Sequence, residues 1–150
     1  MLRHARACIV ASHLLAPPML LSRVYLTSPV DCPEGAEPFL NAVLEAELTG
    51  DALALLHDLR TLEEGLGRPA RSRRNTPRTI DLDLLYVDQT VLNTDTLILP
   101  HPRIAQRRFV LAPLADIRPG LILPGQTETV AQLLKKLPAA DTAEPLDATW

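Results

Sequence analysis

Residues 77–85 read Pro-Arg-Thr-Ile-Asp-Leu-Asp-Leu-Leu, and this run constrains the fold more than any other part of the chain. Acidic and apolar residues alternate in it, which is the pattern of a β-strand with one buried face. We therefore expect a strand over 79–87 in which Asp81 and Asp83 share one face. The intervening apolar side chains share the opposite face, so the chain must form a sheet that is covered on at least one side.

The two aspartates also indicate a kind of chemistry. Neighbouring carboxylates on one face of a strand repel each other, so their arrangement costs free energy unless a cation lies between them. Hard divalent cations such as Mg²⁺ prefer oxygen ligands, and phosphate oxygens often complete the coordination shell. Arg78, which precedes Asp81 by three residues, offers a planar fork for a phosphate. The alternative is a solvent-facing strand edge whose acids discourage aggregation.

Positive charge is concentrated in one part of a chain whose net charge is -3. Between Arg60 and Arg78, six arginines stand against two glutamates, a local charge of +4. Arginine suits phosphate recognition with defined geometry, although a solvated basic loop would have the same composition. A nucleic-acid-binding module is disfavoured by the negative net charge and by the lack of a basic, aromatic-rich sheet face, so we expect no nucleic-acid partner.

Length and composition indicate one globular domain over residues 1–150, because the 150 residues are 47% hydrophobic and 22% charged. No apolar run is long enough to span a bilayer, so we expect no membrane partner. Ser12 and His13 interrupt the apolar stretch near the start, which lacks a cleavage pattern for a signal peptide. Cys8 and Cys32 are too few for a disulfide framework, and a cytoplasmic location is expected.

The order of predicted elements favours an α+β layered domain. Thr49 or Asp51 is expected to cap the best-defined helix, and Gly67 to end it. Helices are expected over 2–15, 49–66, from 103 or 104 towards 113, and 127–137. Strands are expected over 19–27, 39–48 and 79–87, followed by a turn at Asp88-Gln89 and a short return strand at Val91-Leu92. The tail from about 138 to 150 is expected to be loose.

Three further motifs accompany the acidic run. They are Phe39-Leu40-Asn41, Leu62-Glu63-Glu64 with Leu66-Gly67-Arg68, and Pro100-His101-Pro102-Arg103 with Arg107-Arg108-Phe109. In this order and spacing the chain resembles the 6-hydroxymethyl-7,8-dihydropterin pyrophosphokinases over about residues 20–125. The resemblance implies a ferredoxin-like, three-layer α/β/α domain with a mainly antiparallel sheet. It also implies a diphosphotransferase of folate biosynthesis that transfers pyrophosphate from ATP to the pterin hydroxymethyl group and releases AMP.

The resemblance also implies the site residues, with ATP as co-substrate and two Mg²⁺ ions. The metal ligands would be Asp81 and Asp83. The catalytic residues would be Arg68, Arg78, Asp81, Asp83 and Arg107. The nucleotide would contact Glu63, Arg68, Arg78, His101 and Arg107. The pterin would contact Thr27, Ser28, Val30, Phe39, Asn41 and Phe109, with the two rings stacking on its faces.

Several of these residues have plainer explanations. Phe39 and Phe109, the only phenylalanines in the chain, could be ordinary core aromatics. His101 lies between two prolines, where a histidine is more often a simple loop residue. Glu63 could lie on a solvated helix face.

Two departures from the family pattern leave an alternative open. We expect residues 2–15 to match the first helix of the family, without the strand and Gly-Ser-Asn turn that usually precede it; a competing alignment places 10–14 at that turn. Ala70 and Asn75 replace an arginine and an aromatic residue of the arginine-rich loop. The alternative function is therefore a truncated or degenerate, non-catalytic relative that binds pterin or nucleotide weakly. In either case we expect a monomer.

Overall fold

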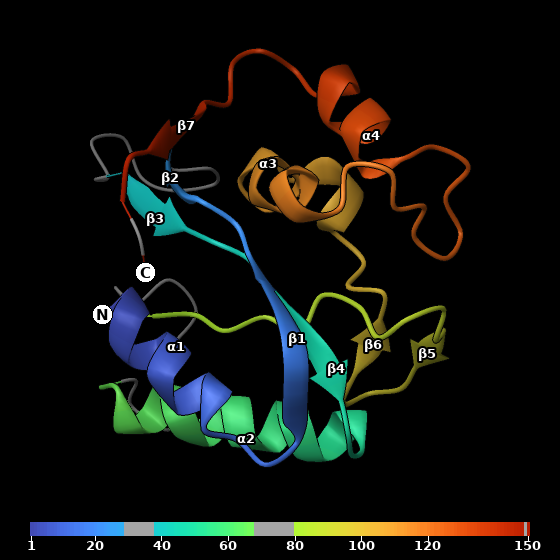
Figure 1. Cartoon of the computed structure of the whole chain (residues 1–150). Helices are drawn as coiled ribbons and strands as arrows, with labels where there is room; N and C mark the ends of the chain where they lie inside the picture. The colour runs from blue at the N-terminus through green and yellow to red at the C-terminus, as the bar shows by residue number, and fades with distance from the viewer. Residues whose placement is uncertain (29–37, 68–79, 149) are drawn as a thin grey trace. The chain divides into compact units, whose positions relative to one another are not determined.

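The computed structural model describes residues 1–28, 38–67, 80–148 and 150 (Figure 1). The described chain divides into two compact units. Unit 1 comprises Met1–Met19, Ala46–Leu84 and Trp150, and unit 2 comprises Leu20–Glu45 and Leu85–Thr149. Helices and antiparallel strands occur together, which confirms the predicted α+β class. No helix among the described residues is both long and apolar enough to cross a membrane.

The described elements follow one another along the chain as helices, strands and one short 3₁₀ helix. The helices are α1 (Leu2–Val10), α2 (Ala52–Gly65), η1 (Ile104–Gln106), α3 (Arg108–Ile117) and α4 (Val130–Lys136). The strands are β1 (Leu15–Leu21), β2 (Val24–Thr27), β3 (Phe39–Asn41), β4 (Leu44–Leu48), β5 (Leu92–Asn93), β6 (Ile98–Leu99) and β7 (Ala143–Leu146). They form three described sheets, with the strand orders β1–β4, β3–β2–β7 and β5–β6.

Unit 1 is built on the contact between α1 and α2. The Asp51 side chain caps α2 by accepting hydrogen bonds from the backbone N–H groups of Leu53 and Ala54. Of the two predicted caps, Thr49 and Asp51, the structure therefore confirms Asp51. After α2, Gly67 has a φ of 103°, a left-handed conformation that favours glycine and ends the helix as predicted. Leu55 and Leu59 on α2 are buried.

The prediction of a helix over 2–15 is wrong in its second half. The helix ends at Val10, and β1 already begins at Leu15. The residues from Leu15 onward pair with β4 in a sheet, so they cannot also continue the helix. The tandem prolines therefore belong to a strand, where the sequence pattern indicates only the end of a helix.

The predicted strands over 19–27 and 39–48 are each divided in two. The break between β1 and β2 lies opposite the break between β3 and β4. There, in unit 2, the backbone N–H of Ser22 donates to the Val43 carbonyl oxygen at 2.9 Å. The Val43 N–H donates in turn to the Ser22 hydroxyl at 2.8 Å. Ser22 is only 5% exposed, so its side chain satisfies a buried backbone donor where regular pairing stops.

The sheet β3–β2–β7 lies in unit 2 and is antiparallel throughout (Figure 1). Its central strand, β2, pairs Thr27 with Phe39 of β3 and with Ala143 of β7. Helix α3 packs against all three strands. A strand with partners on both sides has its backbone donors and acceptors satisfied along both edges, so β2 is the most constrained strand of this unit.

The core of unit 2 gathers around α3. Leu111 and Leu114 of this helix are fully buried beside Val130 of α4 and Ile104 of η1. The helix runs through Pro113 to Ile117, whereas the sequence predicts irregular structure from Leu114. Burial of the leucines on either side of Pro113 outweighs the backbone hydrogen bond that the proline removes.

The segment predicted to be a loose tail contains β7, and this is the largest correction to the predicted elements. Val24 pairs with Leu146, and the ladder continues to Thr27 and Ala143. Pro145 lies in this strand opposite Tyr25. Hydrogen-bonded and non-hydrogen-bonded pairs alternate in an antiparallel ladder, and Pro145 occupies a non-hydrogen-bonded position, where no N–H is needed.

The acidic segment also differs from its prediction. Residues 80–87 pair with no other strand among the residues that the structure describes. The turn at Asp88-Gln89 is confirmed, with the Thr90 N–H donating to the Val87 carbonyl at 2.9 Å. The return strand is β5, and its partner is β6 instead of the acidic segment. Alternation of side chains predicts an extended backbone, but it cannot identify a hydrogen-bonding partner.

Candidate active site

The acidic segment of unit 1 presents its two aspartates on the exposed side. Asp81 and Asp83 are both exposed, whereas Ile80 is buried and Leu82 is half-buried. This alternation agrees with the predicted division of the two faces, even though no ladder holds the segment. Two exposed carboxylates fit Mg²⁺, which binds through one or two carboxylates and fills its remaining positions with water and substrate phosphate oxygens.

A buried glutamate fixes the backbone between the two aspartates. Glu63 of α2 is 3% exposed, and its Oε1 accepts a hydrogen bond from the Leu82 N–H at 2.6 Å. Burial of a carboxylate is costly unless hydrogen bonds compensate it, so this contact holds Leu82 firmly. The alternative that placed Glu63 on a solvated helix face is wrong. Its contact with the nucleotide stays a prediction.

The chain after the aspartates is held by contacts within unit 2. The backbone N–H of His101 donates to the Leu85 carbonyl oxygen at 2.7 Å. The hydroxyl of Tyr86 donates to Glu45, which also forms an ion pair with Arg118. Hydrogen bonds from Arg118 lower the pKa of Glu45, although its burial acts in the opposite direction. Burial raises the pKa of Tyr86, and its hydrogen bond to Glu45 raises it further.

The His101 ring has a defined tautomer in this arrangement. Its Nδ1 accepts a hydrogen bond from the backbone N–H of Arg103 at 3.2 Å. A neutral imidazole that accepts at Nδ1 carries its proton on Nε2. The Nε2–H group is therefore the donor that would serve the predicted phosphate contact.

Three of the predicted pterin residues meet on β2 and β3. The Asn41 side chain donates through Nδ2 to the Thr27 hydroxyl at 2.7 Å, and Thr27 is 2% exposed. The Thr27 hydroxyl in turn donates to the Phe39 carbonyl oxygen at 3.4 Å. The Phe39 ring is 49% exposed, so it is not a core aromatic. The amide orientation of Asn41 is thus fixed by a buried partner next to an accessible ring.

Arg107, a predicted nucleotide contact, and Phe109, a predicted pterin contact, lie together at the start of α3. The Arg107 guanidinium carbon is 5.3 Å from the centroid of the Phe109 ring, within range of a cation–π interaction. The Arg107 carbonyl oxygen accepts from the Leu111 N–H in the first turn of α3. Phe109 is half-buried against the core of unit 2, so the packing of α3 fixes its backbone.

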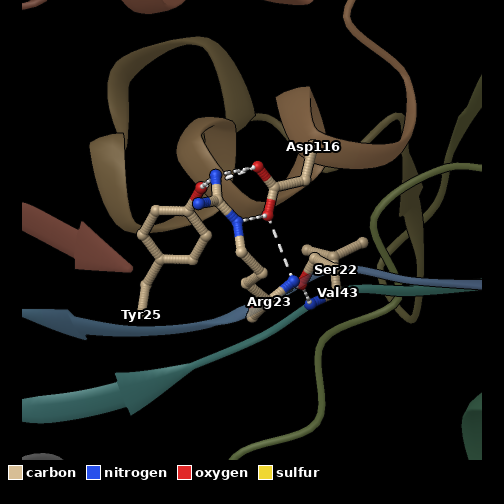
Figure 2. A network of polar contacts seen from close by, with 5 residues as sticks. All are labelled: Ser22, Arg23, Tyr25, Val43 and Asp116. Atoms are coloured by element: carbon tan, nitrogen blue, oxygen red, sulfur yellow. Dashed lines mark hydrogen bonds and ion pairs between the residues drawn. The ribbon is translucent and has the colours of Figure 1, made fainter. Parts of the chain in front are cut away.

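A polar network fixes α3 against β2 (Figure 2). The guanidinium of Arg23 donates to both carboxylate oxygens of Asp116, at 2.7 and 3.1 Å. The Arg23 backbone N–H also donates to Asp116, at 3.1 Å. The buried Tyr25 hydroxyl donates to the same carboxylate at 2.8 Å. Because Asp116 is on the helix that carries Phe109, the network relates that ring to the β2 strand that carries Thr27.

The network shifts the ionisation of each of its members. Burial alone would raise the pKa of Asp116, but the hydrogen bonds from Arg23 and Tyr25 bring it below its ordinary value of 3.8. Burial and the hydrogen bond to Asp116 raise the pKa of Tyr25. The hydrogen bond to Asp116 raises the pKa of Arg23. The carboxylate therefore stays ionised in mildly acidic solution, where its network keeps its full strength.

The predicted site residues are distributed over both units. Asp81, Asp83 and Glu63 belong to unit 1. Unit 2 contains Thr27, Ser28, Phe39, Asn41, His101, Arg107 and Phe109. Val30, Arg68 and Arg78, together with Ala70 and Asn75, lie outside the described residues. Among the described residues, no group of three or more His, Cys, Asp or Glu side chains is arranged to hold a metal ion.

Comparison with known proteins decides the family. The family model of 7,8-dihydro-6-hydroxymethylpterin-pyrophosphokinase (HPPK) matches residues 2–119, which is most of the chain. The chain belongs to this family. The match includes every predicted site residue, from Thr27 to Phe109.

Individual relatives show the same similarity. The 2-amino-4-hydroxy-6-hydroxymethyldihydropteridine pyrophosphokinase of Bacillus subtilis is 40% identical over 116 residues, covering 77% of this chain and 68% of that protein. The protein of the same name from Methylorubrum extorquens is 40% identical over 99 residues, covering 66% and 61%. The folic acid synthesis protein fol1 of Pneumocystis carinii is 36% identical over 99 residues, covering 66% of this chain and 13% of that longer protein.

Sequence reasoning missed the residues that hold the site residues in place. Arg23 and Tyr25 are two positions apart within the strand predicted over 19–27, and this spacing could have indicated a shared polar face. Their partner, Asp116, follows them by about ninety residues, and no local pattern connects it to them. Thr142 and β7 were missed because the run Ala-Glu-Pro-Leu has low strand propensity.

Proposed function

We propose that the chain transfers pyrophosphate from ATP to the hydroxymethyl group of 6-hydroxymethyl-7,8-dihydropterin and releases AMP. Membership in the family supports this reaction. The observation that carries the proposal is the exposed pair Asp81 and Asp83. The buried Glu63 holds the backbone between these two residues. Transfer of this kind depends on positioning and charge neutralisation more than on a covalent protein intermediate.

Asp81 and Asp83 would hold two Mg²⁺ ions on the exposed side of the segment. When bound, the ions would neutralise the triphosphate and polarise its reacting phosphorus. The carboxylates need no proton exchange for this role, and their exposure leaves room for the nucleotide. Burial of Ile80 and partial burial of Leu82 would keep the backbone turned so that both carboxylates remain on the same side.

The remaining phosphate contacts would come from arginines and one histidine. Arg68, Arg78 and Arg107 would bind the polyphosphate and stabilise charge that develops on it. His101 would donate a hydrogen bond through its Nε2–H, in accord with the tautomer that its Nδ1 contact selects. Glu63 would approach the adenosine from its position on α2.

The pterin would bind at the β2 and β3 side of unit 2. Asn41 would pair with polar groups on the pterin edge, since its orientation is fixed by Thr27. Thr27, Ser28 and Val30 would add contacts, mainly through their backbones. The exposed Phe39 ring and the half-buried Phe109 ring would stack on the planar heterocycle. We also expect a monomer that acts in the cytoplasm. Light scattering can check the oligomeric state.

An assay of AMP release tests the proposal. The protein is incubated with ATP, Mg²⁺ and 6-hydroxymethyl-7,8-dihydropterin, and the nucleotides are separated by chromatography. We expect AMP and a pyrophosphorylated pterin in equal amounts, and neither product when EDTA replaces Mg²⁺ or when the pterin is omitted. A folded sample that releases no AMP above background, or that forms ADP and a monophosphorylated pterin, contradicts the proposal.

A further inference from the structure

Residues 142–146 lie beyond residue 119, where the match to the family ends, yet they adjoin the predicted pterin residues. Within this segment, β7 forms one edge of the three-stranded sheet, with β2 in the middle and β3 on the other edge (Figure 1). Thr27 therefore has Ala143 on one side and Phe39 on the other. Helix α3, which carries Phe109, also packs against β7.

Beyond the β2–β7 ladder, this segment contacts Ser28, which directly follows β2. The Ser28 backbone N–H donates to the Thr142 carbonyl oxygen at 3.2 Å. The Thr142 N–H donates to the Ser28 hydroxyl oxygen at 3.0 Å. In a regular antiparallel pair, both bonds join main-chain groups. Here one of the two uses the Ser28 side chain, so this hydroxyl is engaged by Thr142.

We propose that residues 142–146 are a positioning element for the pterin site, acting through Ser28 and Thr27. The proposal rests on the proposed function for the identity of the ligand. Its physical basis is pre-organisation: a backbone already held by the adjacent strand loses less conformational freedom when the ligand binds. The element should therefore affect the binding of the pterin and leave the binding of ATP and the chemical step unchanged.

Replacement of Ser28 in the full-length chain is the first test. Ser28→Ala removes the acceptor for the Thr142 N–H, and we expect the KM for 6-hydroxymethyl-7,8-dihydropterin to rise about threefold to tenfold, the loss of one hydrogen bond. The kcat and the KM for ATP should change by less than about twofold. Ser28→Thr keeps the hydroxyl and should restore the KM. Asp147→Pro, just after β7, serves as the matched control and should leave it unchanged.

Replacement of Thr142 tests whether Ser28 acts through this segment. Thr142→Pro removes the N–H donor and keeps the carbonyl acceptor, so the KM for the pterin should rise as it does for Ser28→Ala. If the two residues act through one contact, the double variant should be no worse than the more severe single variant. Additive effects would mean that Ser28 contacts the pterin independently of Thr142, which overturns the proposal.

A readout that needs no turnover separates this proposal from the proposed reaction. Amide hydrogen exchange of Leu26, Thr27 and Ser28 should be faster in Ser28→Ala and Thr142→Pro than in the parent, and unchanged in Asp147→Pro. Absence of AMP release by the parent protein would count against the reaction. An active parent whose pterin KM and exchange rates are unaffected by both replacements would instead refute the positioning role.

Discussion

The predicted pterin side and the predicted metal side of this protein are held in different ways. On the pterin side, the β2 strand has a partner on each edge, and the Arg23–Asp116 network fixes it against α3. On the metal side, residues 80–84 have no strand partner among the described residues, and the buried Glu63 side chain accepts a hydrogen bond from the backbone between the aspartates. Strand pairing holds the backbone of one side, and a contact between a side chain and the backbone holds that of the other.

The difference shows what each side loses when one of its described hydrogen bonds is removed. A hydrogen bond lost from a ladder leaves neighbouring bonds to maintain the strand. The removal of Glu63 leaves the N–H of the half-buried Leu82 without that acceptor, which carries part of the desolvation penalty of an unmade hydrogen bond. Ligands that bind only the folded state add stability by mass action, so metal and nucleotide should stabilise the acidic segment more than the sheet.

The largest effect is expected from the aspartates themselves. Asp83→Ala removes one carboxylate of the exposed pair, and we expect turnover to fall about a thousandfold or more. Stability should change by less than about 0.5 kcal/mol, because exposed substitutions rarely matter to folding. Asp95→Ala, another exposed acid, is the control. Full activity of Asp83→Ala, measured as AMP release, would refute the metal assignment.

The next largest effect is expected at Glu63. Glu63→Ala should cost about 1 to 3 kcal/mol in unfolding free energy, because the Leu82 N–H loses a buried acceptor. It should also raise the Mg²⁺ concentration needed for half-maximal activity. Urea unfolding and a Mg²⁺ titration measure the two effects. Glu63→Gln retains an acceptor oxygen and should recover most of the loss; equal losses in both variants would show that the carboxylate charge, and not the hydrogen bond, is what matters.

A smaller effect is expected from Asp116, and it should depend on pH. The pKa of Asp116 is lowered in the folded state, so its stabilisation is complete above the ordinary carboxyl pKa and disappears as the pH falls through the lowered value. Asp116→Asn should therefore unfold at a lower temperature than the parent near neutral pH, and the difference should shrink as the pH falls through the lowered pKa of Asp116. Melting curves recorded from neutral pH down to well below the ordinary carboxyl pKa test this expectation, and a constant difference at all pH values would contradict it.

The smallest effect is expected at Pro145. The ladder places this residue at a non-hydrogen-bonded position, so the N–H that Pro145→Ala introduces has no strand partner to gain. The free energy of unfolding should change by less than about 0.5 kcal/mol. Denaturant unfolding measures it, with Pro138→Ala, outside the strand, for comparison. A change above about 2 kcal/mol would show that the register of β7 differs from the one described.

The sequence predicted elements best where local chemistry determines them. Asp51 caps α2 and Gly67 ends it because a side-chain acceptor and a left-handed residue act within one turn of the helix. The exposed aspartates alternate with apolar neighbours as predicted, because alternation is a property of extended backbone alone. The α+β class follows from the same local patterns.

Long-range pairing is where the sequence prediction failed. Nothing near Ala143 indicates that it pairs with Thr27, and Pro145 disfavours a strand by propensity. The acidic segment is the opposite case: its residues are typical of a strand, but it pairs with no described strand, so it was wrongly predicted to be one. Glu63 was predicted as a nucleotide contact from its motif, but its burial against Leu82 depends on a fold contact that the motif does not contain.

The most direct test of the account is where the metal–nucleotide complex binds. Mn²⁺ with a non-hydrolysable ATP analogue is added to isotope-labelled protein, and the loss of amide NMR signals is compared with a Mg²⁺ control. We expect the amide signals at positions 81, 82 and 83 to disappear in the parent protein and to survive in Asp83→Ala. Signal loss centred on other acids such as Glu45 or Asp116, or signal loss that persists in Asp83→Ala, would contradict it.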